Sequence, residues 1–196
     1  TNGKFSLNDF HKKPIIADAD TIYSTHFGCF VVSKAGQKGL YDAEGKCLLP
    51  ITFNNISFDN SRYWLVNKDG KQGLYSHMGK EILPPRYDSI EVACSFCTTA
   101  SNYFIVKKGL YGLCNNEGKF IVDPQYTAIK YRYLRFFKLT KGDSCHYLFN
   151  YKDIIKDITL DDAMPITMQR NEQNLFYFNY KQGKAWGLLR EDGQPI

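Results

Sequence analysis

The residues best suited to chemistry in this 196-residue chain are its six cysteines and four histidines. A cysteine thiolate serves as a nucleophile or metal ligand, and a histidine as a general acid, a base or a ligand. Cys94 and Cys97 have the Cys-x-x-Cys spacing of a zinc site. A structural zinc ion needs four ligands, however, and neither a second such pair nor paired histidines follow. We therefore expect a disulfide or two free thiols here, and no bound metal.

The histidines and acidic pairs give no clear catalytic pattern. None of the histidines stands in a recognisable spacing with a nucleophile, although a triad assembled only by folding stays open. The pairs Asp18 with Asp20 and Asp161 with Asp162 have the chemistry of calcium ligands or paired carboxylates, but we interpret them as exposed loop charges. Because no glycine-rich phosphate loop is present either, we predict a protein without a cofactor and without enzymatic activity. The histidines are His11, His26, His77 and His146.

The segment from Lys130 to Lys138 alternates basic and aromatic residues, as a surface for single-stranded nucleic acid does. In one continuous strand the basic side chains would share one face and the aromatic rings the other, which is also the pattern of a half-buried strand. The net charge is only +5, from 25 basic and 20 acidic residues. We therefore predict no nucleic-acid partner.

Composition favours an all-β protein that does not insert into a membrane. Aromatic residues make up 15% of the chain, with 14 Tyr and 14 Phe, and such residues suit strands. No apolar run approaches the roughly 18 residues that a membrane helix needs. The opening Thr1-Asn2-Gly3 indicates a processed or engineered start, so the cellular compartment is not given. Three cysteines in apolar runs, Cys29, Cys47 and Cys114, are predicted to be buried thiols.

An internal repeat organises most of the chain. Four segments contain Gly-Leu with a second glycine six residues after the first, and the first glycines are spaced 34, 39 and 75 residues apart. Since the last interval is about two periods, a degenerate fourth unit is predicted between residues 136 and 175. The glycine pairs are Gly39 and Gly45, Gly73 and Gly79, Gly112 and Gly118, and Gly187 and Gly193.

Each unit is predicted to consist of three strands joined by two tight turns. Asp69-Gly70 suits the two-residue turn of a hairpin, and the residues that end at Gly79 suit a four-residue turn. We expect a third strand from Ile82 to Ile90, which lies at a sheet edge or breaks there because Pro84-Pro85 cannot donate hydrogen bonds. An aromatic residue followed three positions later by isoleucine is the predicted core of each unit, and Asp161 to Met168 is the least strand-like stretch. The core pairs are Phe53 and Ile56, Tyr87 and Ile90, and Tyr126 and Ile129.

At these residues the chain resembles the WG-repeat family, which is named for a Trp-Gly pair followed by a turn glycine and a proline-rich third strand. The resemblance covers roughly residues 30 to 196. Only Trp186-Gly187 carries the tryptophan, since Lys38, Gln72 and Tyr111 stand at the equivalent positions. Such repeats are abundant in bacterial proteins, and the resemblance implies a non-catalytic binding role.

The predicted organisation is a single repeat domain that spans residues 1–196. Ile15 to Ile22 resembles a third strand without its first two, so it either completes the last unit or caps the array. We favour completion, which closes a five-unit propeller-like ring; an open β-solenoid is the alternative. The predicted segments are 1–29 for this strand, 30–63, 64–103 and 104–135 for repeats 1 to 3, 136–175 for the degenerate repeat 4, and 176–196 for an incomplete repeat 5.

The preferred function is a non-catalytic β-repeat scaffold that binds a protein or a glycan through the loops between its repeats. Its rivals are an enzyme with a site assembled from loops and a structural array without a discrete ligand. Aromatic residues on irregular segments are the predicted anchors. They are Tyr63, Tyr103, Tyr133 and Trp186.

Overall fold

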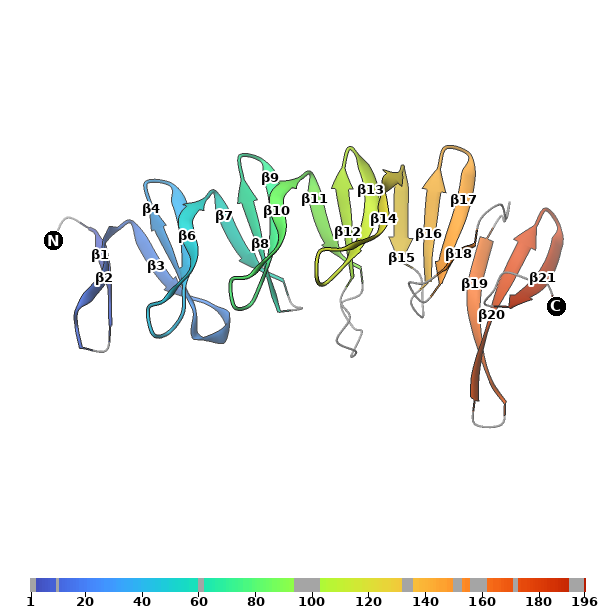
Figure 1. Ribbon diagram of the computed structural model, residues 1–196, viewed down its shortest axis with the longest axis horizontal. Coiled ribbons are helices and arrows are strands. Elements are labelled where there is room, and N and C mark those ends of the chain that lie inside the picture. The colour runs from blue at the N-terminus through green and yellow to red at the C-terminus, as the bar shows by residue number, and fades with distance from the viewer. Residues whose placement is uncertain are drawn as a thin grey trace. The chain divides into compact units, whose positions relative to one another are not determined.

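The computed structural model describes residues 3–9, 11–59, 62–93, 103–131, 136–149, 153–155, 162–170, 173–190 and 196. Antiparallel strands dominate these residues (Figure 1), and the only helical element among them is a 3-10 turn, η1 (His26–Gly28). The predicted all-β class is therefore confirmed. The chain divides into two compact units, the first formed by residues 1–102 with 116–118 and the second by residues 103–115 and 119–196.

The first unit contains a two-stranded sheet and two four-stranded sheets. Each sheet follows chain order, so within a sheet the strands that are consecutive in sequence are hydrogen-bonded neighbours. Sheet β1–β2 has β1 (Phe5–Asn8) and β2 (Pro14–Ala19). Sheet β3–β6 has β3 (Thr21–Ser24), β4 (Phe30–Lys34), β5 (Gln37–Tyr41) and β6 (Cys47–Phe53). Sheet β7–β10 has β7 (Asn55–Phe58), β8 (Tyr63–Lys68), β9 (Lys71–Ser76) and β10 (Glu81–Tyr87), after which comes β11 (Ser89–Val92).

The second unit continues the same up-and-down order. Antiparallel pairs join β12 (Tyr103–Lys108), β13 (Leu110–Asn115) and β14 (Phe120–Tyr126). A four-stranded sheet consists of β15 (Ala128–Tyr131), β16 (Phe136–Lys141), β17 (Ser144–Phe149) and β18 (Asp153–Ile155). A three-stranded sheet consists of β19 (Asp162–Arg170), β20 (Gln173–Gln182) and β21 (Ala185–Arg190).

The sheets and the sequence repeats are out of phase by one strand. The predicted third strand from Ile82 to Ile90 is two strands, β10 and β11. At the equivalent place in the preceding repeat, the chain bends at Asn54, and β7 pairs with β8 of the next sheet. The break is required because Phe53 and Ile56 are both buried, whereas residues three apart in a continuous strand face opposite sides. Ile15 to Ile22 is likewise divided, between β2 and β3.

The predicted turns are confirmed. Asp69 and Gly70 have φ angles of 51° and 75°, as a type I′ hairpin requires, and Ala35 and Gly36 repeat this geometry. In the four-residue turns the first side chain accepts a backbone N–H from the residue after the glycine. Examples are Asp42 Oδ1 with Lys46 at 2.7 Å and Asn115 Oδ1 with Lys119 at 2.9 Å. The closing glycines, Gly45, Gly79 and Gly118, have φ between 79° and 85°.

In the first three repeats the first glycine of the motif is needed because the third strand passes over it. A Cβ on Gly73 would lie 2.8 Å from the backbone nitrogen of Pro85, and one on Gly112 would lie 2.7 Å from the carbonyl oxygen of Val122. These distances are too short for any side chain. The third strand bulges at this point, and in the first unit β6 and β10 form the predicted sheet edges.

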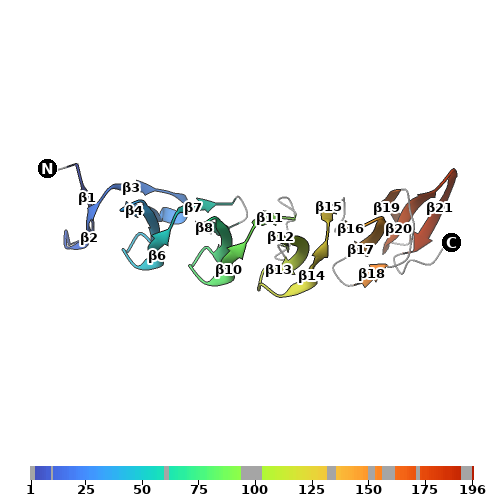
Figure 2. The same ribbon diagram turned by 90° about the horizontal axis from the view of Figure 1, so that it is seen from above.

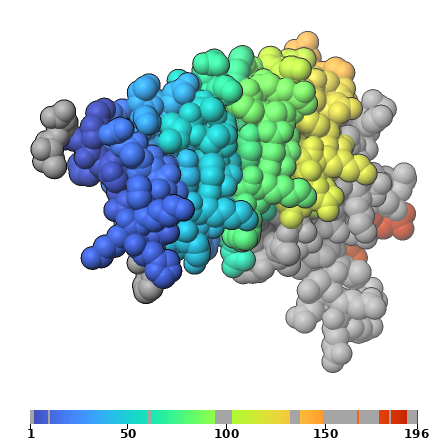
Figure 3. All heavy atoms as spheres, turned by 60° about the vertical axis from the view of Figure 1, so that its left-hand side comes forward, coloured from blue at the N-terminus to red at the C-terminus, as the bar shows by residue number. Residues whose placement is uncertain are grey.

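A hydrophobic cluster joins sheets β3–β6 and β7–β10. Figures 1 and 2 both show the two sheets side by side, and Figure 3 shows them as adjoining bands from blue to green on one face. The turn at Gly79 also lies against β6, since a Cβ on Gly79 would be 2.5 Å from the carbonyl oxygen of Leu48. The predicted core pairs are confirmed as buried. The cluster consists of Cys29, Val31, Leu40, Leu49, Phe53, Ile56, Trp64 and Val66.

The fourth repeat departs from the pattern at His146. β16, β17 and β18 supply its three strands, but His146 stands on β17 at the place of the motif glycine, as the hairpin registers show. A side chain here excludes a third strand that crosses as in the other repeats. β18 instead pairs further along β17, at Tyr147, Leu148 and Phe149, in a regular register without a bulge. The second motif glycine is also missing, since Lys152 stands six residues after His146, so this repeat is hard to recognise.

Three other expectations prove wrong. The segment expected to be least strand-like forms β19, which pairs with β20 in nine consecutive registers. Lys130 and Lys138 belong to two antiparallel strands as direct cross-strand partners, so they share a face of one sheet but not one strand. Cys47 is exposed, because it begins β6 at a sheet edge, whereas Cys29 and Cys114 are buried as predicted.

Candidate binding surface

The predicted anchors differ in exposure. Tyr63 is half-buried at the start of β8, where its backbone N–H donates to Asp59 Oδ1 at 2.9 Å. Tyr103 is half-buried at the start of β12. Trp186 has 60% of its surface exposed on β21, with the Lys181 ammonium 5.6 Å from its ring centroid. Tyr133 lies outside the described residues.

A more prominent aromatic surface lies in the first unit, at residues that sequence reasoning did not single out. Phe27, on η1, is 58% exposed. Its ring lies 5.3 Å from the Phe58 ring and 5.8 Å from the His77 imidazole. The His26 imidazole stacks on Phe58 at 4.3 Å. Below them, Phe58 contacts the buried ring of Trp64 edge-on at 4.9 Å. We call these five residues the Phe27 surface.

Local structure holds the Phe27 surface in place. Phe58 and Trp64 are direct cross-strand partners in β7 and β8. The Trp64 indole N–H donates to the carbonyl oxygen of His77 at 3.3 Å, which fixes the turn that carries this imidazole. The backbone N–H of Cys29 donates to the carbonyl oxygen of His26 at 3.1 Å and closes η1. The surface therefore combines residues from both four-stranded sheets.

Phe27 has an unusual backbone conformation. Its φ is 58° and its ψ is 30°, which is the left-handed region. That conformation costs a residue with a Cβ roughly 1–2 kcal/mol. A glycine or asparagine would adopt it more easily. Backbone strain of this kind is concentrated at functional sites, so an exposed aromatic side chain held there calls for an explanation beyond folding.

Two carboxylates lie beside η1. The turn after β5 approaches it, because a Cβ on Gly28 would be 3.7 Å from the Cβ of Ala43. Burial raises the pKa of the Cys29 thiol, and the carboxylates of Asp42 and Glu44 raise it further. The negative charge of these carboxylates therefore reaches the residues that support Phe27.

One histidine has a tyrosine partner. The Tyr126 hydroxyl and the His146 Nδ1 are 3.0 Å apart, and burial raises the pKa of Tyr126. Tyr126 is only 2% exposed. The pair thus links β14 to β17. The sequence signal for it was a histidine at the position of a motif glycine.

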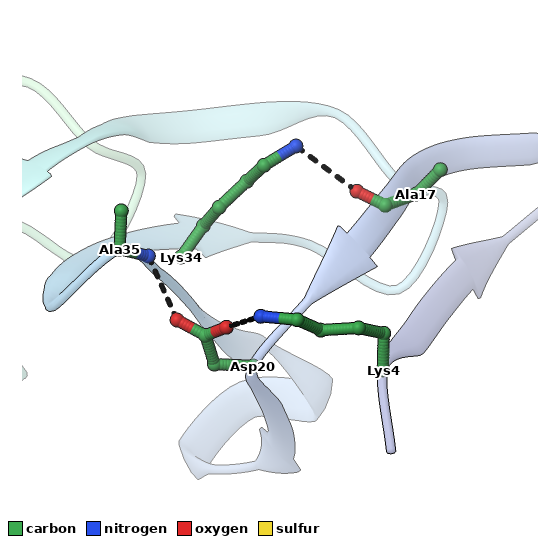
Figure 4. A network of polar contacts seen from close by, with 5 residues as sticks. All are labelled: Lys4, Ala17, Asp20, Lys34 and Ala35. Carbon is green, nitrogen blue, oxygen red and sulfur yellow. Dashed lines mark hydrogen bonds and ion pairs between the residues drawn. The ribbon is translucent and has the colours of Figure 1, made fainter. Parts of the chain in front are cut away.

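The predicted acidic sites are ordinary surface contacts where they can be described. Asp20 forms an ion pair with Lys4 and accepts the backbone N–H of Ala35 at 2.7 Å (Figure 4). The Lys4 hydrogen bond, with that of Ala35, lowers the pKa of Asp20. Asp18 is exposed, whereas Asp161, Cys94 and Cys97 lie outside the described residues. Among those that are described, no group of three or more His, Cys, Asp or Glu side chains is placed to hold a metal ion.

No helix in the described part of the chain is long and apolar enough to cross a membrane.

No curated protein matches the chain. Similar solved structures include BBS1N in complex with ARL6DN, at a TM-score of 0.32 and 10% identity over 90% of this chain and 65% of that one. The AfRom2 CNH domain gives a TM-score of 0.30 and 12% identity over 91% of this chain and 70% of that one. The chain thus spans less than two thirds of the length of BBS1N.

The model of the WG containing repeat matches residues 73–93 and 111–133. These two matches begin at or just before the motif glycines Gly73 and Gly112 and include their turn glycines and proline-containing third strands. The matched residues are those for which the fold gives a physical reason, namely close backbone approach, turn geometry and core burial. Residues 73–93 and 111–133 therefore carry repeats of the WG-repeat family.

Proposed function

We propose that this chain is a non-catalytic β-repeat module that binds a protein or glycan partner at the Phe27 surface. The observation that carries the proposal is the exposed Phe27 ring on a left-handed backbone. Folding alone favours a smaller or more flexible residue there. The glycines, prolines and core aromatics of the repeats already have roles in folding, whereas this phenylalanine has none that requires its exposed ring.

The chemistry of the surface supports binding more than catalysis. Phe27, His26 and His77 offer ring faces and edges for stacking, which suit apolar side chains and sugar rings alike. Trp186, with Lys181 beside it, is retained as a second candidate anchor in the other unit. The opposing proposal, an enzyme with a site built from loops, would need an accessible nucleophile and base held together. The histidine with a tyrosine partner, His146, contacts an enclosed hydroxyl instead.

The test is capture of partners by the full chain, from a lysate and on a glycan array, with matched variants. Phe27→Asn removes the ring and keeps a residue that tolerates a left-handed backbone. Phe5→Asn is the control, because Phe5 on β1 is 53% exposed and lies outside the Phe27 surface. We expect Phe27→Asn to lose partners that Phe5→Asn retains. Equal capture by both variants would place binding elsewhere, and Trp186→Ala and Tyr133→Ala then test the remaining anchors.

Closure of the repeats into a five-unit ring also remains a proposal. The described strand pairs form separate antiparallel sheets. Support for closure comes from the likeness of Ile15–Ile22 to a third strand. The pairing of β2 with β1 weakens it, because the segment has a partner of its own. Small-angle X-ray scattering decides between the forms: a maximum dimension close to that of a sphere of this mass supports a ring, and a much longer one supports an open solenoid.

A further inference from the structure

The charges around the Phe27 surface indicate which class of partner it suits. Asp42 and Glu44 both follow β5 in the turn that approaches η1. Asp42 is fixed by its hydrogen bond to the backbone N–H of Lys46, whereas Glu44 is exposed at the tip of the turn. Both carboxylates act electrostatically on Cys29, two residues from Phe27. Lys46 is the one basic residue of this turn, so with Asp42 and Glu44 the turn is acidic on balance beside the exposed ring.

That border discriminates among macromolecules. Nucleic acids and acidic glycans carry negative charge and would be repelled by Asp42 and Glu44, and neutral glycans gain no Coulombic attraction from them. A polypeptide with lysine or arginine is attracted, and its apolar side chains can stack on Phe27. The exposed Met78 next to His77 is an adaptable contact of the kind used at peptide-binding surfaces.

We propose that the Phe27 surface binds a segment of a partner protein in which an aromatic or long aliphatic side chain is flanked by lysine or arginine. The apolar side chain packs against the rings of Phe27, Phe58 and His77. The basic residue lies toward the turn that carries Asp42 and Glu44. This inference rests on the proposed function and names the partner class for the same surface.

The experiment is panning of a phage-displayed random dodecapeptide library against the immobilised full chain. Enriched sequences are then synthesised, and their affinities are measured by fluorescence polarisation. We expect them to share an apolar side chain beside lysine or arginine and to bind Phe27→Asn at least about tenfold more weakly. Glu44→Gln should weaken binding about two- to fivefold, as expected for an exposed charge pair, and added salt should remove that difference.

Matched variants separate the possible failures. Glu91→Gln removes an exposed carboxylate on β11 and should leave the affinity unchanged. This inference is overturned if peptides that need Phe27 for binding lack basic residues, or if Glu44→Gln leaves their affinity unchanged. Either result leaves the proposed function standing. No enrichment, or enriched peptides that bind Phe27→Asn equally, also overturns it. Glycan-array binding that is lost in Phe27→Asn then keeps the proposed function with a different partner class.

Discussion

Asn54 Oδ1 accepts the backbone N–H of Asp69 at 2.7 Å. Asp20 Oδ2 accepts the backbone N–H of Ala35 at the same distance, again 15 residues later in the chain. Each acceptor stands at the bend between one sheet and the next, and each donor has a φ of 51° in a hairpin turn. The residue at the bend therefore stabilises the left-handed turn of the sheet that follows.

Replacement of Asn54 by alanine tests this relationship. We expect Asn54→Ala to lower the free energy of unfolding by about 1 kcal/mol, because the Asp69 turn loses its acceptor. Asn54→Asp keeps an oxygen in place and should cost much less. Asn55→Ala is the neighbouring control, since it removes only an exposed contact with Lys38. Urea denaturation measures all three, and equal costs for Asn54→Ala and Asn55→Ala would contradict the assigned role.

Gly73 tests why the repeat motif needs its first glycine. Gly73→Ala should cost about 3 kcal/mol, because its Cβ would lie 2.8 Å from the backbone of Pro85, which cannot move without shifting β10. Gly70→Ala meets no atom within 4 Å, so only its positive φ opposes the change, at about 1 kcal/mol. Chemical denaturation of both variants compares the two causes. A smaller loss in Gly73→Ala than in Gly70→Ala would show that β10 yields easily.

Cys114 predicts how stability falls at alkaline pH. Burial raises the pKa of its thiol from 9.0 to about 12 in the folded chain. The folded state thus favours the protonated thiol, and this contribution is complete below pH 9 and is lost as the pH rises toward 12. Above pH 9 it should decline by up to about 1.4 kcal/mol per pH unit.

Urea unfolding between pH 8 and pH 11 measures this loss. Cys114→Ala should be less stable at pH 8, because a buried side chain is shortened, but its stability should fall less steeply with pH. Cys145→Ala is the control variant, because it removes a thiol that is only partly buried. Parallel curves for wild type and Cys114→Ala would mean that the thiol is not enclosed as the structure has it.

The two tryptophans should report opposite environments. Trp64 is 1% exposed and Trp186 is 60% exposed. Trp186→Phe, which keeps Trp64, should therefore emit at shorter wavelength and resist quenching by acrylamide. Trp64→Phe should emit at longer wavelength and be quenched readily. Steady-state fluorescence of the folded variants measures both properties, and similar quenching constants would contradict the exposure of Trp186.

Sequence reasoning succeeded where the cause of a structure is local. The Asp69-Gly70 hairpin, the turn at Gly79 and the edge position of Pro84-Pro85 depend on dihedral preferences and missing donors that any reader of the sequence can apply. The offset between repeats and sheets escaped because it depends on partners in the next repeat. Its signal was nevertheless present, since Phe53 and Ile56 cannot share a face in an unbroken strand.

The candidate surface was harder to foresee. His26, Phe58 and His77 are far apart in sequence and meet only because the bend at Asn54 places η1 beside the next sheet. Aromatic residues in irregular segments pointed to Tyr63, which begins a strand and is half-buried. The His26-Phe27-Gly28 segment was not predicted to be part of a binding surface, because no pattern in the sequence indicates the positive φ of Phe27. Exposure of a side chain is likewise a property of the surrounding fold.

The offset of one strand also has a consequence for how such chains change length. In sheets β3–β6 and β7–β10, the first strand of each sheet is encoded upstream of the motif that defines its repeat. Gain or loss of one whole period joins equivalent positions, so each sheet still receives four strands wherever the join falls. A join out of phase deprives one sheet of a strand. Unequal recombination within the gene therefore preserves the sheets when it adds or removes whole periods, and the position of the join does not matter.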